Sequence, residues 1–224
     1  AAVWKGSIHM NAIQFANWLP DLLSGLKITV LASIVAILTS VVWGCVLASL
    51  RCLNLRVLSA VIRIYIVIFR NVPLLVVMFF LFYGLPLVGV DIPAVFCGVI
   101  SLTLNEGAFV AEIIRGSIKN MPRGEVEAAK SLGLGRLTII RRITFPLAFR
   151  ASIPMLLGQS SIVIKDTSLF SMIMIMDLTR AGSQYYATYF SPTAIWIVGV
   201  VYVAIFLIFT IVGRVVENKV VVKR

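Results

Sequence analysis

The sequence predicts an all-α membrane protein with five transmembrane helices. Of its 224 residues, 60% are hydrophobic and only 13% are charged, and the mean hydropathy is +1.03. Soluble domains carry about 25% charged residues, so this composition is that of an integral membrane protein. Several apolar runs approach the roughly 20 residues that a helix needs to cross about 30 Å of hydrocarbon. The net charge of +11 is attributed to loops that face anionic lipid rather than to contact with nucleic acid.

Residues 1–18 are expected to form an N-terminal extracytoplasmic segment. Its start, AAVWKGSIHM, lacks the basic stretch and apolar core of a cleaved signal peptide. An artificial extension before Met10 and a native N-terminus are both open. The sole histidine, His9, lies in this stretch and is interpreted as a bystander rather than a ligand.

Breaker residues divide the expected membrane domain, residues 19–216, into five apolar runs, and residues 217–224 follow as a cytoplasmic tail. The three cysteines lie in or beside these runs without a C-x-x-C spacing, so they are interpreted as small buried hydrophobes and no metal site is predicted. The expected spans are Leu26–Leu50, Ile64–Leu85, Ile92–Ile114, Ile153–Met176 and Thr193–Val212.

The distribution of basic residues predicts the orientation of these spans. Arginines separate the first two spans, whereas residues 84–93, between the second and third, contain no Lys or Arg. Basic residues crowd the next connection and the C-terminus, while only Arg180 lies between the fourth and fifth spans. Because Lys and Arg favour cytoplasmic loops, we expect the N-terminus outside and the C-terminus in the cytoplasm.

The connection between the third and fourth spans contains a charged segment broken by glycines, EAAKSLGLGRLTIIRRITFP, from Glu127 to Pro146. Acidic residues at the start of Glu125–Leu132 predict a short helix, which Gly133 ends as a left-handed cap. A second short helix is expected over residues 136–142. The small residues along the first helix favour docking of a partner protein, and a helix resting on the lipid surface is the alternative.

One set of six residues in this segment has a specific spacing: Glu127, Ala128, Ala129, Gly133, Ile143 and Pro146. In this spacing the segment resembles the EAA loop of ABC importer permeases, apart from Phe145, where that family usually has leucine. In that family the loop forms a coupling helix, which lies in a groove of the ATP-binding subunit and transmits its closure to the membrane helices. The resemblance implies the same role for the six residues.

Three further segments are similar to the polar amino-acid subgroup of that family, the histidine, glutamine and glutamate permease type: residues 69–75, 105–116 and 165–169. The resemblance implies a type I importer fold and a permease subunit in the bacterial inner membrane. It implies as partners a second permease, identical or paralogous, two ATP-binding cassette subunits and an extracytoplasmic binding protein. The implied cargo is a polar amino acid, with an opine or other amino-acid derivative as the alternative.

The chain itself is not expected to be an enzyme. It has no G-x-x-x-x-G-K-[ST] phosphate loop, so ATP and Mg²⁺ are assigned to the partner subunits, and no cofactor or catalytic residue is predicted here. A membrane enzyme would need a nucleophile with a base or a metal cluster, and neither H-E-x-x-H nor G-x-S-x-G occurs. A stand-alone secondary carrier would predict an inverted repeat, and five spans do not divide into equal halves.

Ionisable residues inside the expected spans are candidates for the substrate path, because each charge costs about 3 kcal/mol at the bilayer centre. Four polar residues interrupt the fourth span: Lys165, Asp166, Thr167 and Ser168. They offer an acid, a base and two hydroxyls to a zwitterion, and pairing with neighbouring helices is an equally open alternative. Arg70 enters the second span near a kink expected at Pro73, where it either lines the path or reaches toward the interface.

Glu112 and Arg115 are three residues apart near the end of the third span, so we expect an i,i+3 ion pair with a structural role. Glu106 departs from the small polar residue that the subgroup often has at this position, and no site role is assigned to it.

Overall fold

The computed structural model describes residues 10, 12–53 and 55–221, and the regular elements in this part of the chain are all helical. This confirms the all-α character of the predicted fold class. The α-helices are α1 (Ala12–Cys52), α2 (Arg56–Asn71), α3 (Leu74–Phe79), α4 (Ala94–Lys119), α5 (Arg123–Ser131), α6 (Arg136–Ile139), α7 (Phe145–Asp166), α8 (Leu178–Tyr189) and α9 (Thr193–Val221). Shorter helical turns follow α3 (π, Phe80–Gly84, then 3₁₀, Leu85–Val88), α6 (π, Ile140–Thr144) and α7 (3₁₀, Thr167–Ile173).

Four helical segments of the described chain are long and apolar enough to cross a membrane by themselves: Ala12–Cys52, Ala94–Lys119, Arg136–Ile173 and Thr193–Lys219. A fifth crossing results if α2 and the segment Leu74–Val88, which meet at an angle of 104°, count as one broken span. The five expected spans agree with this larger count.

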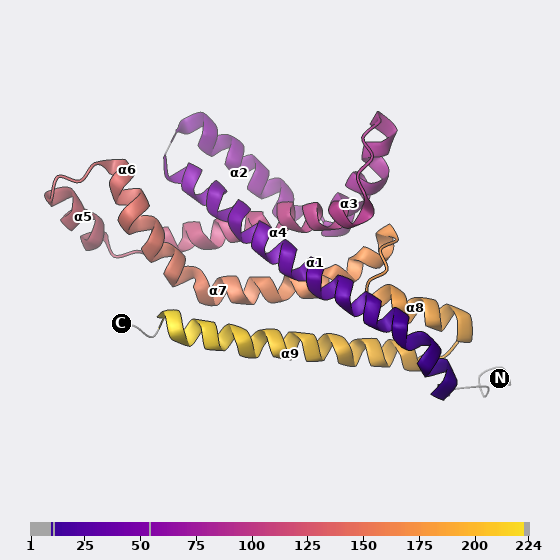
Figure 1. The fold of residues 1–224 in the computed structure, drawn as a ribbon. Helices are drawn as coiled ribbons and strands as arrows, with labels where there is room; N and C mark the ends of the chain where they lie inside the picture. Colours follow the sequence, from indigo (N-terminus) through magenta and orange to yellow (C-terminus); the bar gives the residue numbers. More distant parts are fainter. Residues whose placement is uncertain (1–9, 11, 54, 222–224) are drawn as a thin grey trace.

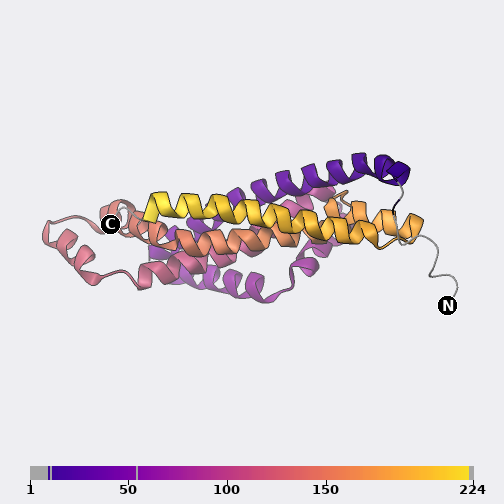
Figure 2. The same cartoon turned by 90° about the horizontal axis from the view of Figure 1, so that it is seen from below.

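The helices pack into an elongated bundle whose long axis is the same in two perpendicular views (Figures 1 and 2). α1 begins at the end of the bundle where α8 lies, and α9 finishes toward the other end, where α5 and α6 project (Figure 1). The first and last helices thus start and finish at opposite ends, as an odd number of crossings requires.

The two helices α1 and α4 approach each other closely because glycines face the partner helix. A Cβ atom on Gly44 would lie 2.4 Å from the Cγ1 atom of Val110, and a Cβ atom on Gly107 would lie 2.6 Å from the Cδ1 atom of Trp43. Small residues allow this approach, and the resulting van der Waals contact is what holds membrane helices together. Three buried alanines extend the close packing along the same pair of helices: Ala48, Ala108 and Ala111.

α9 has the opposite character, because its apolar side chains face outward. Val200, Val203, Leu207 and Ile211 are each more than half exposed. An apolar surface of this kind is unfavourable in water but not in hydrocarbon, which is as apolar as the side chains themselves. The surface of α9 therefore fits a bilayer environment.

The second span is broken rather than kinked. Val72 has an extended backbone (φ −79°, ψ 129°), and Pro73 begins the next helical segment. The missing backbone donor of proline by itself predicts only a kink. The additional cause is that a proline ring excludes the residue before it from the helical region, so α2 ends at Asn71 and the chain turns sharply.

α1 is longer than expected, because it begins at Ala12 rather than near Leu26. Its first turns pack against α8 and α9, with the indole of Trp18 donating a hydrogen bond to the carbonyl of Ala181 at 3.0 Å. Residues 12–18 are thus part of this helix, whereas residues 1–9, with His9, lie outside the described part of the chain.

The second short helix expected over residues 136–142 is instead the start of the fourth span. α6, the π-helical turn Ile140–Thr144 and α7 follow one another without a break, so the span begins at Arg136 rather than near Ile153. Pro146 does not end the helix, because the π-helical turn just before it shifts the register of the backbone hydrogen bonds.

The packing of α1 on α4 predicts that Gly44→Leu destabilises the protein. The leucine side chain has no space against Val110, and such overpacking costs about 1–3 kcal/mol or more. We expect the thermal midpoint in detergent to fall by about 5 °C or more. Gly199→Leu on α9 is the matched control, because Gly199 is exposed and a Cβ atom there meets nothing within 4 Å. Equal midpoints for the two variants would contradict the proposed packing constraint.

Candidate functional site

α5 forms a short amphipathic helix on the connection between α4 and α7. Glu125 lies in its first turn and Lys130 in its last turn. Ala129 is buried, whereas Glu127 and Ala128 on the same helix are exposed. One side of α5 thus packs against the rest of the chain, and another side is exposed and can contact a partner.

A defined turn ends α5 and fixes its direction relative to α7. Gly133 has a φ of +73°, the left-handed conformation expected for the glycine cap. Its N–H donates to the carbonyl of Lys130 at 2.9 Å, and the N–H of Leu134 donates to the carbonyl of Ala129 at 3.2 Å. These two bonds form a Schellman motif, which satisfies carbonyls at the helix end. A side chain at position 133 would strain this backbone.

The other two residues of the spacing motif lie beyond this turn, at the start of the fourth span. Ile143 lies in the π-helical turn and is half-buried, and Pro146 lies in the first turn of α7 and is exposed. The motif therefore covers a short helix, a fixed turn and the first part of a long helix.

A cavity of about 810 Å³ lies between α5 and the neighbouring ends of α1 and α4. Its lining includes Glu127 together with basic and apolar side chains. The basic residues that line it are Arg51, Arg115, Lys119, Lys130 and Arg136. Glu127 therefore faces a strongly cationic surface within its own chain.

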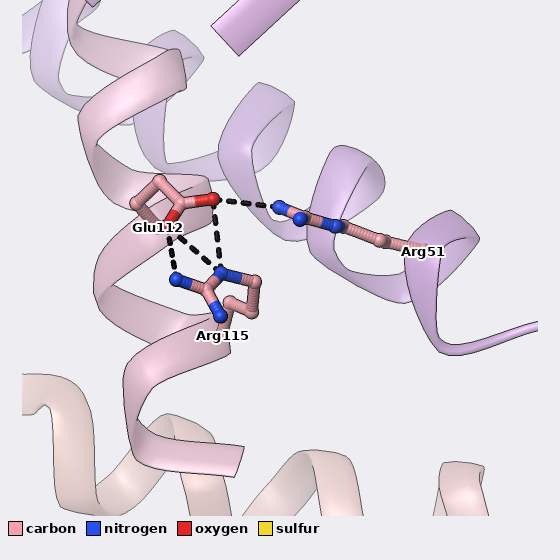
Figure 3. Close-up of polar contacts among 3 residues, drawn as sticks. All are labelled: Arg51, Glu112 and Arg115. Carbon is pink, nitrogen blue, oxygen red and sulfur yellow. Dashed lines mark hydrogen bonds and ion pairs between the residues drawn. The ribbon is translucent and has the colours of Figure 1, made fainter. Parts of the chain in front are cut away.

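An ion cluster of Arg51, Glu112 and Arg115 joins α1 to α4 (Figure 3), and its two arginines also line this cavity. Arg115 donates to Glu112 at 2.6–3.0 Å, which is the pair expected from the i,i+3 spacing. Arg51 of α1 donates to the same carboxylate at 2.6 Å. Sequence reasoning used Arg51 only for membrane orientation, because nothing local links it to a residue sixty-one positions away.

The polar stretch in the fourth span lies where its helix changes type. α7 ends at Asp166, and the 3₁₀-helix Thr167–Ile173 follows. Lys165 is exposed, with its Nζ atom 4.7 Å from the centre of the Phe206 ring on α9. Thr167 is fully buried and its hydroxyl donates to the carbonyl of Ile164, whereas Ser168 is only half-buried. Lys165, Asp166 and Ser168 are therefore more accessible than Thr167.

A buried acid to which the sequence assigns no role, Glu106, is bonded to α7, the helix that ends at Asp166. Glu106 of α4 is only 2% exposed and accepts a hydrogen bond of 2.7 Å from the amide of Gln159 on α7. Gln159 and Asp166 are seven residues apart, hence on one face of α7, and this spacing is the signal that could have revealed the cluster.

Arg70 lies in a different place from this polar cluster. It is exposed at the end of α2, and its guanidinium lies 5.0 Å from the centre of the Phe109 ring. Together with Glu112 and Arg115 it lines a separate pocket of about 290 Å³. The structure thus associates Arg70 with the ion cluster rather than with Lys165.

The fold and these sites define a class of protein. The chain is a multi-pass helical bundle, and the exposed helix α5 lies on the connection between α4 and α7. The Gly133 turn joins α5 to the fourth span, which contains charged residues. This is the arrangement of a membrane permease subunit.

Comparison with known proteins identifies the family. Residues 40–222 match the model of the binding-protein-dependent transport system inner membrane component, and the chain belongs to this family. It is 33% identical over 197 residues to the nopaline transport system permease protein of Agrobacterium fabrum, covering 83% of this chain and 82% of that protein. It is also 33% identical over 204 residues to the glutamine transport system permease protein of Escherichia coli, covering 90% of this chain and 93% of that protein.

A solved structure has the same fold. It is a crystal structure of an amino acid ABC transporter with histidines, which superposes with a TM-score of 0.84 at 29% sequence identity. The alignment covers 94% of this chain and 99% of the solved chain. The chain is thus a multi-pass membrane permease with the type I ABC importer fold, and its relatives are transport subunits rather than enzymes.

The ion cluster predicts that Glu112→Gln destabilises the joint between α1 and α4. The change leaves Arg51 and Arg115 without their shared carboxylate, and losing hydrogen bonds to charged groups costs on the order of 1–3 kcal/mol. The thermal midpoint in detergent should fall by several degrees, whereas Glu125→Gln on exposed α5 should leave it unchanged. A midpoint for Glu112→Gln equal to that of the unaltered protein would rule out a stabilising role.

Proposed function

We propose that this chain is the path-forming permease subunit of an ATP-driven importer of polar amino acids in the bacterial inner membrane. The observation that carries the proposal is the match of α5, the Gly133 turn and the start of α7 to the EAA spacing, on a helix exposed for contact. In this proposal α5 lies in the cytoplasm and the start of α1 lies outside, consistent with the basic residues around α5.

The ATP-binding subunit docks on α5 in this mechanism. The motif residues Glu127, Ala128, Ala129, Gly133, Ile143 and Pro146 then act as the coupling element. Because the Gly133 turn is closed by two backbone hydrogen bonds, a displacement of α5 passes to the start of the fourth span rather than bending the loop. The helical segment from Arg136 to Lys165 is about 45 Å long at 1.5 Å per residue. A movement at the docking helix is thereby delivered to the polar stretch.

The polar stretch at the end of α7 is the proposed contact with the cargo. An amino-acid zwitterion carries an ammonium and a carboxylate, and this region offers the acid Asp166 and the base Lys165, whereas Glu106 is buried and bonded to Gln159. Charge-assisted hydrogen bonds to these groups replace the hydration that the cargo loses inside the membrane. Thr167 shapes the end of the helix rather than contacting the cargo, because its hydroxyl is bonded to the backbone. Ser168 offers its hydroxyl to the cargo.

The nopaline permease among its relatives favours an opine or another amino-acid derivative as the second candidate cargo. Such molecules retain the zwitterion and differ in the side group. The same site therefore serves either class, and selection between them falls to an extracytoplasmic binding protein that delivers the cargo. A second permease chain and two ATP-binding subunits, which hold ATP and Mg²⁺, complete the proposed machine.

Glu127→Lys should uncouple the importer. The variant adds a sixth basic residue to a cavity already lined by five lysines and arginines, and it reverses the charge offered to the ATPase. We expect either loss of the copurifying ATPase or a fall of at least about tenfold in uptake, equivalent to 1.4 kcal/mol or more in coupling. Glu125→Lys changes the same charge on the same helix outside the motif and should retain uptake. Unchanged uptake by Glu127→Lys would falsify the coupling role. An equal loss of uptake in Glu127→Lys and Glu125→Lys would mean that the effect of Glu127→Lys is a general effect of charge on α5.

Asp166→Asn should weaken transport while the complex still assembles. Loss of a hydrogen bond to a charged group costs about 1.5–3 kcal/mol, which corresponds to roughly a 10- to 100-fold rise in the KM for uptake. Asp91→Asn, at an exposed position outside α7, is the control. Normal uptake at limiting amino acid by the Asp166 variant would exclude a direct contact with the cargo.

A further inference from the structure

The pocket that contains Arg70 is lined by four arginines from three helices. Arg63 and Arg70 come from α2, Arg51 comes from α1 and Arg115 comes from α4. The single acidic residue in its lining is Glu112, and the pocket volume is about 290 Å³. No role in docking or in contact with the cargo requires these four cations to lie together.

The positive charge of this pocket is not balanced within the described part of the chain. Both oxygens of Glu112 are already occupied by Arg51 and Arg115. Neither Arg63 nor Arg70 has a carboxylate within 4.0 Å among the described residues. Four guanidinium groups facing one carboxylate leave an excess of three positive charges, which calls for an anion from outside the chain.

The two arginines of α2 are arranged to face the same ligand. Arg63 and Arg70 are seven residues apart, so they lie on nearly the same side of the helix. Arg56 continues this row one heptad earlier but does not line the pocket. Planar guanidinium groups bind phosphate oxygens through paired hydrogen bonds, and arginine is the preferred residue for this contact.

The surroundings of the pocket are those of a lipid rather than a free anion. The remaining lining residues from α2 are Ile66, Val67 and Asn71, and Val67 is 55% exposed. Ile64 and Ile68 beside it are also exposed, at 60% and 49%. α2 is the first part of a broken membrane span, so these apolar side chains lie next to the bilayer. Basic pockets between membrane helices are typical binding places for anionic lipid head groups.

We propose that this pocket binds the phosphate of an anionic phospholipid, whose acyl chains lie along the exposed apolar side of α2. Arg63 and Arg70 bind the phosphate, and Arg51 and Arg115 contribute from the ion cluster that joins α1 to α4. The bound lipid neutralises the pocket and connects α2 to that joint. This site is separate from the cargo contact and does not depend on which substrate is transported.

The test compares two arginine variants in the purified permease complex. Arg63→Gln removes a charge from the pocket at an exposed position, and Arg56→Gln removes the same charge from the same row outside the pocket. The probe is phosphatidylglycerol, with phosphatidylcholine as the uncharged comparison, and bound lipid is counted by native mass spectrometry. We expect the unaltered complex to retain phosphatidylglycerol over phosphatidylcholine, Arg63→Gln to lose at least tenfold in apparent affinity, and Arg56→Gln to remain within twofold.

Each other outcome overturns the proposal. Equal losses of phosphatidylglycerol affinity in both variants mean that the basic residues attract anionic lipid diffusely rather than at a defined site. Displacement of the lipid by millimolar inorganic phosphate means that the pocket takes a free anion. Loss of a second permease chain from the Arg63→Gln complex, with lipid binding unchanged, means that another protein covers this side of α2.

Discussion

The close approach of α1 and α4 is the constraint on which the rest of the structure depends. Neither Gly44 nor Gly107 has room for a side chain of its own, because Val110 and Trp43 of the facing helix fill the space. Glu112 then fixes their ends through Arg51 and Arg115. α4 also places Glu106 against Gln159 of α7, so the position of the polar cluster depends on the same helix. A shift between α1 and α4 would thus displace the ion cluster and the proposed cargo contact together.

The fourth span joins the two proposed functional regions of the chain. At one end the Gly133 turn fixes α5 to α6, and at the other end α7 changes to a 3₁₀-helix at Thr167. A change of helix type leaves some backbone N–H and C=O groups available to bind a polar ligand. Charged side chains and helix breaks therefore occur together in transport sites. The same continuous helix can therefore receive a push from a docked ATPase and alter the surroundings of Asp166.

The parts predictable from the sequence were those determined locally. Composition and hydropathy predicted the helical membrane fold, and the chemistry of glycine predicted the cap at Gly133. Contacts between distant residues were not predictable, because neither the bond from Arg51 to Glu112 nor that from Gln159 to Glu106 leaves a local pattern. The sharp break after Asn71 was underestimated, although Pro73 gave its position. The start of α1 was missed because its first turns depend on packing against α8.

The most direct test of the account is to map what touches α5 in the intact membrane complex. A photo-crosslinking amino acid at position 132, where Leu132 is 79% exposed next to the Gly133 turn, is compared with one at position 196, where Trp196 is 76% exposed on α9. The account predicts that position 132 crosslinks to the ATP-binding subunit and position 196 does not. Crosslinks from position 132 to lipid alone, in membranes that contain the ATPase, would contradict the assignment of α5 as the coupling helix.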